Sequence, residues 1–96
     1  MTKLIIVTNV AAIDNAGRNA VTAYLEGRGW SVWHWFQDLW LIDSNDVVDP
    51  VTLREELNKV LPSLAQVIVF STRDAAKNYS GLVPPDSVDW FKQHWG

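Results

Sequence analysis

The chain has 96 residues, of which 48% are hydrophobic and 20% are charged, a balance typical of one folded domain and not of a disordered segment. Its 8 basic and 11 acidic residues give a formal net charge of −3, which disfavours general binding to nucleic acid, because such binding needs Lys and Arg at the phosphates. With no cysteine, disulfides and Cys-ligated zinc are excluded. The apolar run at residues 4–7 is too short for a signal peptide or a membrane span, so we expect a cytoplasmic protein without a membrane partner.

The first elements are a strand and a helix. Residues 4–10 form a β-branched apolar run, which predicts a strand buried on both faces. A polar loop follows, and residues 15–28 then carry apolar side chains at three- and four-residue spacing, which predicts an amphipathic helix. Gly27 and Gly29 are expected to end it.

The next segment predicts a β-hairpin rich in tryptophan. In residues 30–36 the side chains alternate, so that one set (Trp30, Val32, His34, Phe36) faces away from the other (Ser31, Trp33, Trp35). Residues 39–43 form a second strand-like run after the polar break at 37–38. Both sets are apolar, so the alternation does not say which one faces the helices.

The second half of the chain predicts another helix, another strand and a short C-terminal helix. An apolar stripe after Pro50 predicts the helix; its members are Leu53, Leu57, Val60, Leu61 and Leu64. Asp49 is expected to cap this helix by accepting a hydrogen bond from a first-turn N–H, and Pro50 suits its first position. Residues 66–72 predict the fourth strand, and Asp86 or Ser87 is expected to cap the last helix. The order β-α-β-β-α-β predicts one α+β domain over residues 1–96, a ferredoxin-like sandwich with an antiparallel four-stranded sheet and both main helices on one face.

Three segments carry a resemblance to a known family. They are the aromatic hairpin 29–42, the strand 66–72 with the glycine-containing loop after it, and the ending 87–92. Together they resemble the SinR-like proteins, small relatives of the second CRISPR-associated protein in the Cas-two-like superfamily. The resemblance spans most of the chain in order and spacing, and it implies a ferredoxin-like fold and a homodimer. By analogy it also implies a role in phage–host conflict.

The resemblance further implies an acidic residue at the end of the first strand, where two copies would hold a divalent metal. Here Asn9 stands at that position, and its neutral amide oxygen is a much weaker ligand for Mg²⁺ than a carboxylate. Asp14, five residues on, is the remaining candidate for a metal ligand, although a single loop aspartate is more often a turn residue or a helix cap. The substitution at Asn9 favours a protein without catalytic activity, metal or cofactor.

Three further features each have a structural interpretation that is simpler than a functional site. His34 lies among aromatic residues with no second ligand nearby, which favours a packed histidine. The loop 14–18 opens a helix but has one glycine and no Gly-Lys-Ser/Thr, so it favours an ordinary cap over a phosphate loop. The aromatic hairpin suits base stacking, but no basic residue occurs between Arg28 and Arg54, which disfavours an RNA-binding face.

The leading hypothesis is a non-catalytic, homodimeric protein-interaction module on a Cas-two-like scaffold. A four-stranded sheet with both helices on one side leaves its other side open, and we place the interface there, at Trp33, Trp35 and Trp40. An unidentified protein partner, or the C-terminal tail folded back over the sheet, is the alternative cover. The alternative functions are a metal-dependent nuclease that uses Asp14 or another acidic residue, and an RNA-binding module that uses the aromatic face.

Overall fold

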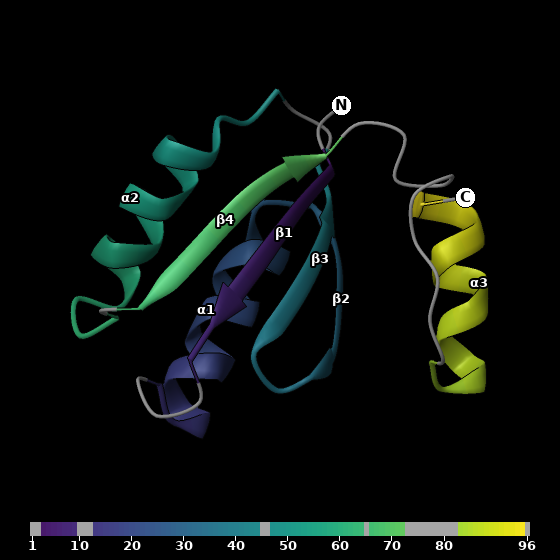
Figure 1. The fold of residues 1–96 in the computed structure, drawn as a ribbon, viewed down its shortest axis with the longest axis horizontal. Coiled ribbons are helices and arrows are strands. Elements are labelled where there is room, and N and C mark those ends of the chain that lie inside the picture. The colour runs from purple at the N-terminus through teal and green to yellow at the C-terminus, as the bar shows by residue number, and fades with distance from the viewer. Residues whose placement is uncertain (1–2, 10–12, 45–46, 65, 73–82, 96) are drawn as a thin grey trace.

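The structure is a computed structural model that describes residues 3–9, 13–44, 47–64, 66–72 and 83–95 (Figure 1). The strands are β1 (Lys3–Thr8), β2 (Ser31–Phe36), β3 (Leu39–Asp43) and β4 (Val67–Thr72). The two main helices are α1 (Asn15–Gly27) and α2 (Pro50–Val60). Residues 85–95 form a further helical segment, built from η3 (Pro85–Ser87), α3 (Val88–Trp90) and η4 (Phe91–Trp95), which we call the C-terminal helix.

The four strands form one antiparallel sheet in the order β2-β3-β1-β4. The chain passes from β1 to β2 through α1 and from β3 to β4 through α2, so each helical connection skips one strand. This arrangement is an α+β fold and is consistent with a ferredoxin-like one. None of the described helices has the length and hydropathy of a membrane span.

The main core lies between one face of the sheet and the helices α1 and α2. Leu4 and Ile6 of β1 and Trp40 of β3 are fully buried there. The helices contribute the apolar side chains that their spacing predicts: Val21, Leu25, Leu53 and Leu57. Fully burying a side chain of this size stabilises a fold by about 1.5–3 kcal/mol, so this cluster dominates the packing energy.

A second, smaller core lies on the opposite face of the sheet. There Trp33 and Leu41 pack against Phe91 and Trp95 of the C-terminal helix. In Figure 1 this helix, drawn in yellow, lies apart from α1 and α2 and across the sheet from them. Part of the face that α1 and α2 leave open is therefore covered from within the same chain, as in the alternative in which the tail folds back.

Three local expectations are wrong. Neither Asp86 nor Ser87 caps the C-terminal helix with its side chain: Pro84 precedes η3, and Ser87 precedes α3 without making a capping hydrogen bond.

The other two concern Asp49 and β2. Asp49 precedes α2, but its side chain accepts no capping hydrogen bond from a backbone N–H of the first turn; its carboxylate accepts from the Thr52 hydroxyl instead, at 3.4 Å. The alternation in β2 fails at Phe36, because the register with β3 shifts between Trp33 and Phe36. Phe36 then pairs with Leu39 and its ring lies 5.0 Å from that of Trp33, so the two share a face.

Candidate functional site

The open face of the sheet carries two apolar rows that cross all four strands. The strand registers place four side chains opposite one another in the first row, and four in the second. From β2 to β4 the first row is Phe36, Leu39, Val7 and Ile68, and the second is Trp33, Leu41, Ile5 and Phe70. A third row, Ser31, Asp43, Lys3 and Thr72, is polar. The face is therefore apolar over two thirds of its length and polar at one end.

The C-terminal helix covers only part of these rows. It buries Trp33 and Leu41, whereas Phe36 remains 50% exposed, Ile68 57% and Phe70 49%. Between them in the first row lie the partly buried Val7 and Leu39, of which Leu39 also packs against the second core. We call these five residues, Val7, Phe36, Leu39, Ile68 and Phe70, the open-face patch. These five side chains carry no charge. Monomeric proteins rarely leave such contiguous apolar surface bare unless it binds something.

The three tryptophans expected at an interface lie in three different environments. Trp35 is 57% exposed and directly precedes Phe36 in the sequence. Trp33 is only 2% exposed because the C-terminal helix covers it, and its ring lies 5.3 Å from that of Phe91. Trp40 is fully buried on the other face, under α1 and α2. Of the three, Trp35 is the one that a partner reaches without any rearrangement.

Packing on Trp40 explains the position of the His34 side chain. The two rings stack with centroids 4.2 Å apart and planes 2° from parallel, and His34 Nδ1 lies 2.9 Å from the carbonyl oxygen of Leu39. The indole Nε1–H of Trp40 donates to Thr22 Oγ1 at 2.9 Å. His34 is a packed, hydrogen-bonded side chain, as the sequence favours.

At the end of β1, Asn9 and Asp14 have separate partners. The Asn9 side-chain amide donates to Gln66 Oε1 at 2.6 Å, and the Asp14 carboxylate accepts from the backbone N–H of Gly17. An open hollow of about 380 Å³ lies beside Asn9 and adjoins the open-face patch. Its lining consists of Val7, Thr8, Asn9, Gln66, Val67 and Ile68. In the parts of the chain that the structure describes, no three His, Asp or Glu side chains are grouped so that they could hold a metal ion.

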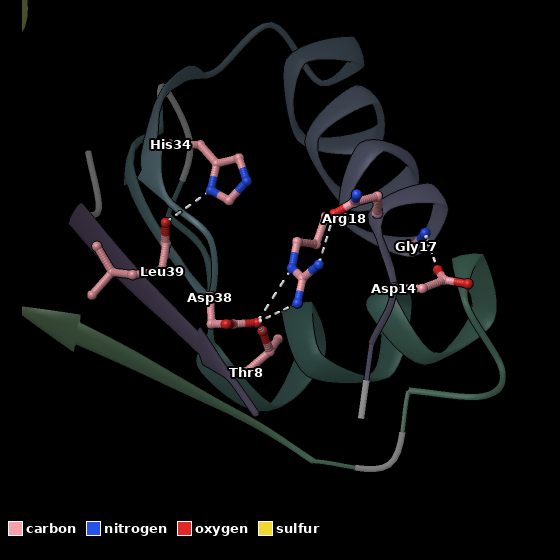
Figure 2. Close-up of polar contacts among 8 residues, drawn as sticks. Thr8, Asp14, Gly17, Arg18, His34, Asp38 and Leu39 are labelled. Carbon is pink, nitrogen blue, oxygen red and sulfur yellow. Dashed lines mark hydrogen bonds and ion pairs between the residues drawn. The ribbon is translucent and has the colours of Figure 1, made fainter. Parts of the chain in front are cut away.

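A buried polar cluster next to this region has no counterpart in the sequence interpretation. Figure 2 shows the Arg18 guanidinium of α1 directed at the Asp38 carboxylate in the β2–β3 turn, with N–O distances of 3.3 and 3.4 Å. The same carboxylate oxygen accepts from the Thr8 hydroxyl at 2.9 Å, and Arg18 Nη1 donates to Asn15. The arginine of the loop 14–18 is thus committed to a carboxylate and an amide within the protein. We assign the cluster a structural role: it fastens the hairpin turn to the start of α1.

A second polar side-chain contact lies at the polar end of the open face. His94 of the C-terminal helix lies with Nδ1 2.8 Å from Asp43 Oδ2, and both side chains are partly buried. This contact joins the C-terminal helix to the polar row. Neither residue had a role in the sequence interpretation, because 51 positions separate them and no local pattern links them.

No protein-family model matches this chain, and a comparison with curated proteins yields no relative.

Proposed function

We propose that this protein is a non-catalytic protein-interaction module that acts as a homodimer, on a ferredoxin-like scaffold of the Cas-two-like type. The observation that carries the proposal is the open-face patch, an uncharged apolar surface that crosses the sheet beside an exposed Trp35. Aromatic side chains at such a surface supply large contact area with little conformational freedom to lose. A link to phage–host conflict rests on the resemblance alone.

The extent of the patch supports a modest interface. Three side chains of the patch, Phe36, Ile68 and Phe70, are each about half exposed. If each presents ~200 Å² when fully exposed, together they offer roughly 300 Å² of apolar surface. That is at the lower end of the range of patches that are often functional, and less than half of what one partner contributes to a standard interface. A second copy of the same surface, related by a two-fold axis, is the simplest complement to it.

The two alternative functions receive less support. A nuclease needs carboxylates that converge on a metal, whereas the position at the end of β1 is an amide and Asp14 is engaged with the start of α1. An RNA-binding face needs cations among its aromatic side chains, whereas the rows that hold Trp33 and Phe36 contain none.

Light scattering of the wild type and of an Ile68→Glu, Phe70→Glu double variant tests the proposal. Both positions are solvent-exposed, so charged side chains there are compatible with the fold. We expect the wild type at micromolar concentration to have the mass of two chains, and the double variant to have the mass of one chain with an unchanged circular dichroism spectrum.

Val51→Glu is the matched control. Val51 is 54% exposed on α2, close to the values for Ile68 and Phe70, but it lies outside the open face. We expect this variant to remain dimeric. A wild type with the mass of one chain would refute the homodimer, and a dimer that survives the double variant but not Trp35→Glu would move the interface to the β2 edge.

A further inference from the structure

The two edge strands of the sheet, β2 and β4, differ in regularity. The pairing of β2 with β3 is interrupted between Trp33 and Phe36. β4 pairs with β1 without a break over its whole length, Val67–Thr72. Bulges, prolines and charged side chains are the usual devices that keep a sheet edge from pairing with another chain. β4 has none of the three.

The composition of β4 also suits strand pairing. Its six residues are Val-Ile-Val-Phe-Ser-Thr, β-branched and aromatic over the first four positions and uncharged throughout. Among the described residues, no strand pairs with the outer side of β4. Ile68 and Phe70, which point to the open face, are 57% and 49% exposed. The edge therefore presents backbone donors and acceptors beside two exposed apolar side chains.

Two copies of β4 fit each other in a defined register. In an antiparallel pair, residues directly opposite each other point to the same face of the sheet. Between identical strands this requires the two-fold axis to pass through a residue. An axis at Val69 places Ile68 opposite Phe70 of the second copy, and Phe70 opposite the second Ile68. An axis at Phe70 would instead place Ile68 opposite Thr72, so the axis at Val69 is the one that pairs apolar with apolar.

We propose that a second copy of this chain adds to the β4 edge in the antiparallel register centred on Val69. The two four-stranded sheets then form one continuous sheet. Their open-face patches lie on the same side and meet across the axis through Ile68 and Phe70. Cross-strand pairs of aromatic and β-branched side chains stabilise such a contact. The proposal rests on the proposed function, because it names the contact through which the homodimer forms.

Disulfide cross-linking tests the edge contact. The chain has no cysteine, so a single introduced thiol reports on one position. In the proposed register the two Cα atoms of residue 69 are about 4.5–5.5 Å apart, which is within the range of a disulfide. We expect Val69→Cys at micromolar concentration, under mild oxidation, to form a covalent dimer about tenfold faster than Val51→Cys, because neighbouring thiols have a millimolar effective concentration. Val51, 54% exposed on α2, is the control for random collision.

Two further variants at exposed positions test the register without touching the helix-facing side of the sheet. A mixture of Ile68→Cys and Phe70→Cys proteins should form the mixed disulfide, identified by mass spectrometry. Each of the two alone should cross-link as slowly as Val51→Cys. Rapid cross-linking of Phe70→Cys alone would place the axis at Phe70 and overturn the proposed register.

Light scattering of the wild type separates failure of the edge contact from failure of the homodimer. A mass of one chain would refute the proposed function, and this inference with it. A mass of two chains, with no rapid disulfide in Val69→Cys or in the mixture, would overturn the edge contact and leave the homodimer standing. Val69 packs on the main core, so two open-face patches in face-to-face contact leave its thiol variant out of reach.

Discussion

The carboxylate of Asp14 accepts a hydrogen bond from the backbone N–H of Gly17, three residues on, at 2.7 Å. Asp14 has extended backbone angles and precedes the first residue of α1, so it is the N-cap of that helix. We expect Asp14→Ala to lower the free energy of unfolding by about 1 kcal/mol, measured by urea denaturation. Asp14→Asn should lower it by much less, because the amide oxygen still accepts the bond.

The same variants separate the cap from a metal ligand. We expect no Mg²⁺- or Mn²⁺-dependent cleavage of nucleic acid by the purified protein, because Asn9 lacks the carboxylate and Asp14 is engaged with Gly17. Cleavage that requires the metal, persists through purification and disappears in Asp14→Asn would contradict this assignment.

Gly17 and Gly27 lie in the same helix but have opposite space around them. A Cβ at Gly17 would lie 2.9 Å from Ile13 Cγ1 and 3.0 Å from Leu61 Cδ2, whereas one at Gly27 would meet nothing within 4 Å. We expect Gly17→Ala to destabilise the protein by about 1–3 kcal/mol through overpacking. Gly27→Ala should stabilise it by about 0.5–1 kcal/mol, because alanine favours the helical backbone. Thermal denaturation of the two variants side by side checks both signs; a stabilising Gly17→Ala would show that α1 approaches Ile13 less closely.

The Arg18–Asp38 ion pair is expected to be the most sensitive polar contact in the fold. The side chains of Arg18 and Asp38 are 9% and 22% exposed. Removing either one therefore leaves the charge of the other partly desolvated and without its partner. Because Asp38 retains some contact with water, we expect Asp38→Ala to cost about 2–3 kcal/mol, below the value for a fully buried pair. A double-mutant cycle with Arg18→Met, measured by urea denaturation, should show that the double variant loses less than the sum of the single ones. Additive losses would show that the pair is not coupled.

Tyr24 provides a prediction about alkaline pH. Burial raises the pKa of Tyr24 above its ordinary value of 10.0, its hydrogen bond to Glu56 raises that pKa further, and Arg28 partly opposes the rise. The folded protein therefore keeps the phenol protonated at a pH where the unfolded chain releases the proton. Its contribution to stability is complete below about pH 10 and is lost as the pH rises through the folded-state pKa.

Comparison with Tyr24→Phe isolates that contribution, because the other titrating groups are common to both proteins. We expect the wild type to be the more stable near pH 8, and the difference in free energy of unfolding to shrink toward pH 11. A difference that stays constant over this range would mean that the phenol ionises alike in the folded and unfolded chains.

Helix positions were predicted well because the signals are local. The stripe that contains Leu53 and Leu57 repeats every three or four residues, and both side chains are fully buried, as that spacing requires. Pro50 is the first residue of α2, as expected, and Gly29 adopts a φ of 79° just beyond α1. The expected capping bond of Asp49 did not form, because the identity of a capping residue does not by itself determine its side-chain orientation.

The sites were harder to predict. Arg18 and Asp38 are 20 positions apart, and each on its own looks like an ordinary surface residue of a loop or turn. Only the packing of the β2–β3 turn against the start of α1 brings them together. The apolar rows of the open face likewise depend on strand register, which one bulge between Trp33 and Phe36 was enough to alter.

The sequence by itself determined the order of strands and helices and the buried faces of the two main helices, because periodicity and turn residues act over a few neighbouring positions. It left open which face each tryptophan of the hairpin would occupy, because both faces of β2 are apolar and alternation separates two sets without orienting them. Only the tertiary structure decided that Trp40 lies under α1 and α2, that Trp33 lies under the C-terminal helix, and that Trp35 remains exposed. The physical reason is that each position is set by contacts between segments far apart in the chain, such as Trp33 with Phe91 and Asp43 with His94.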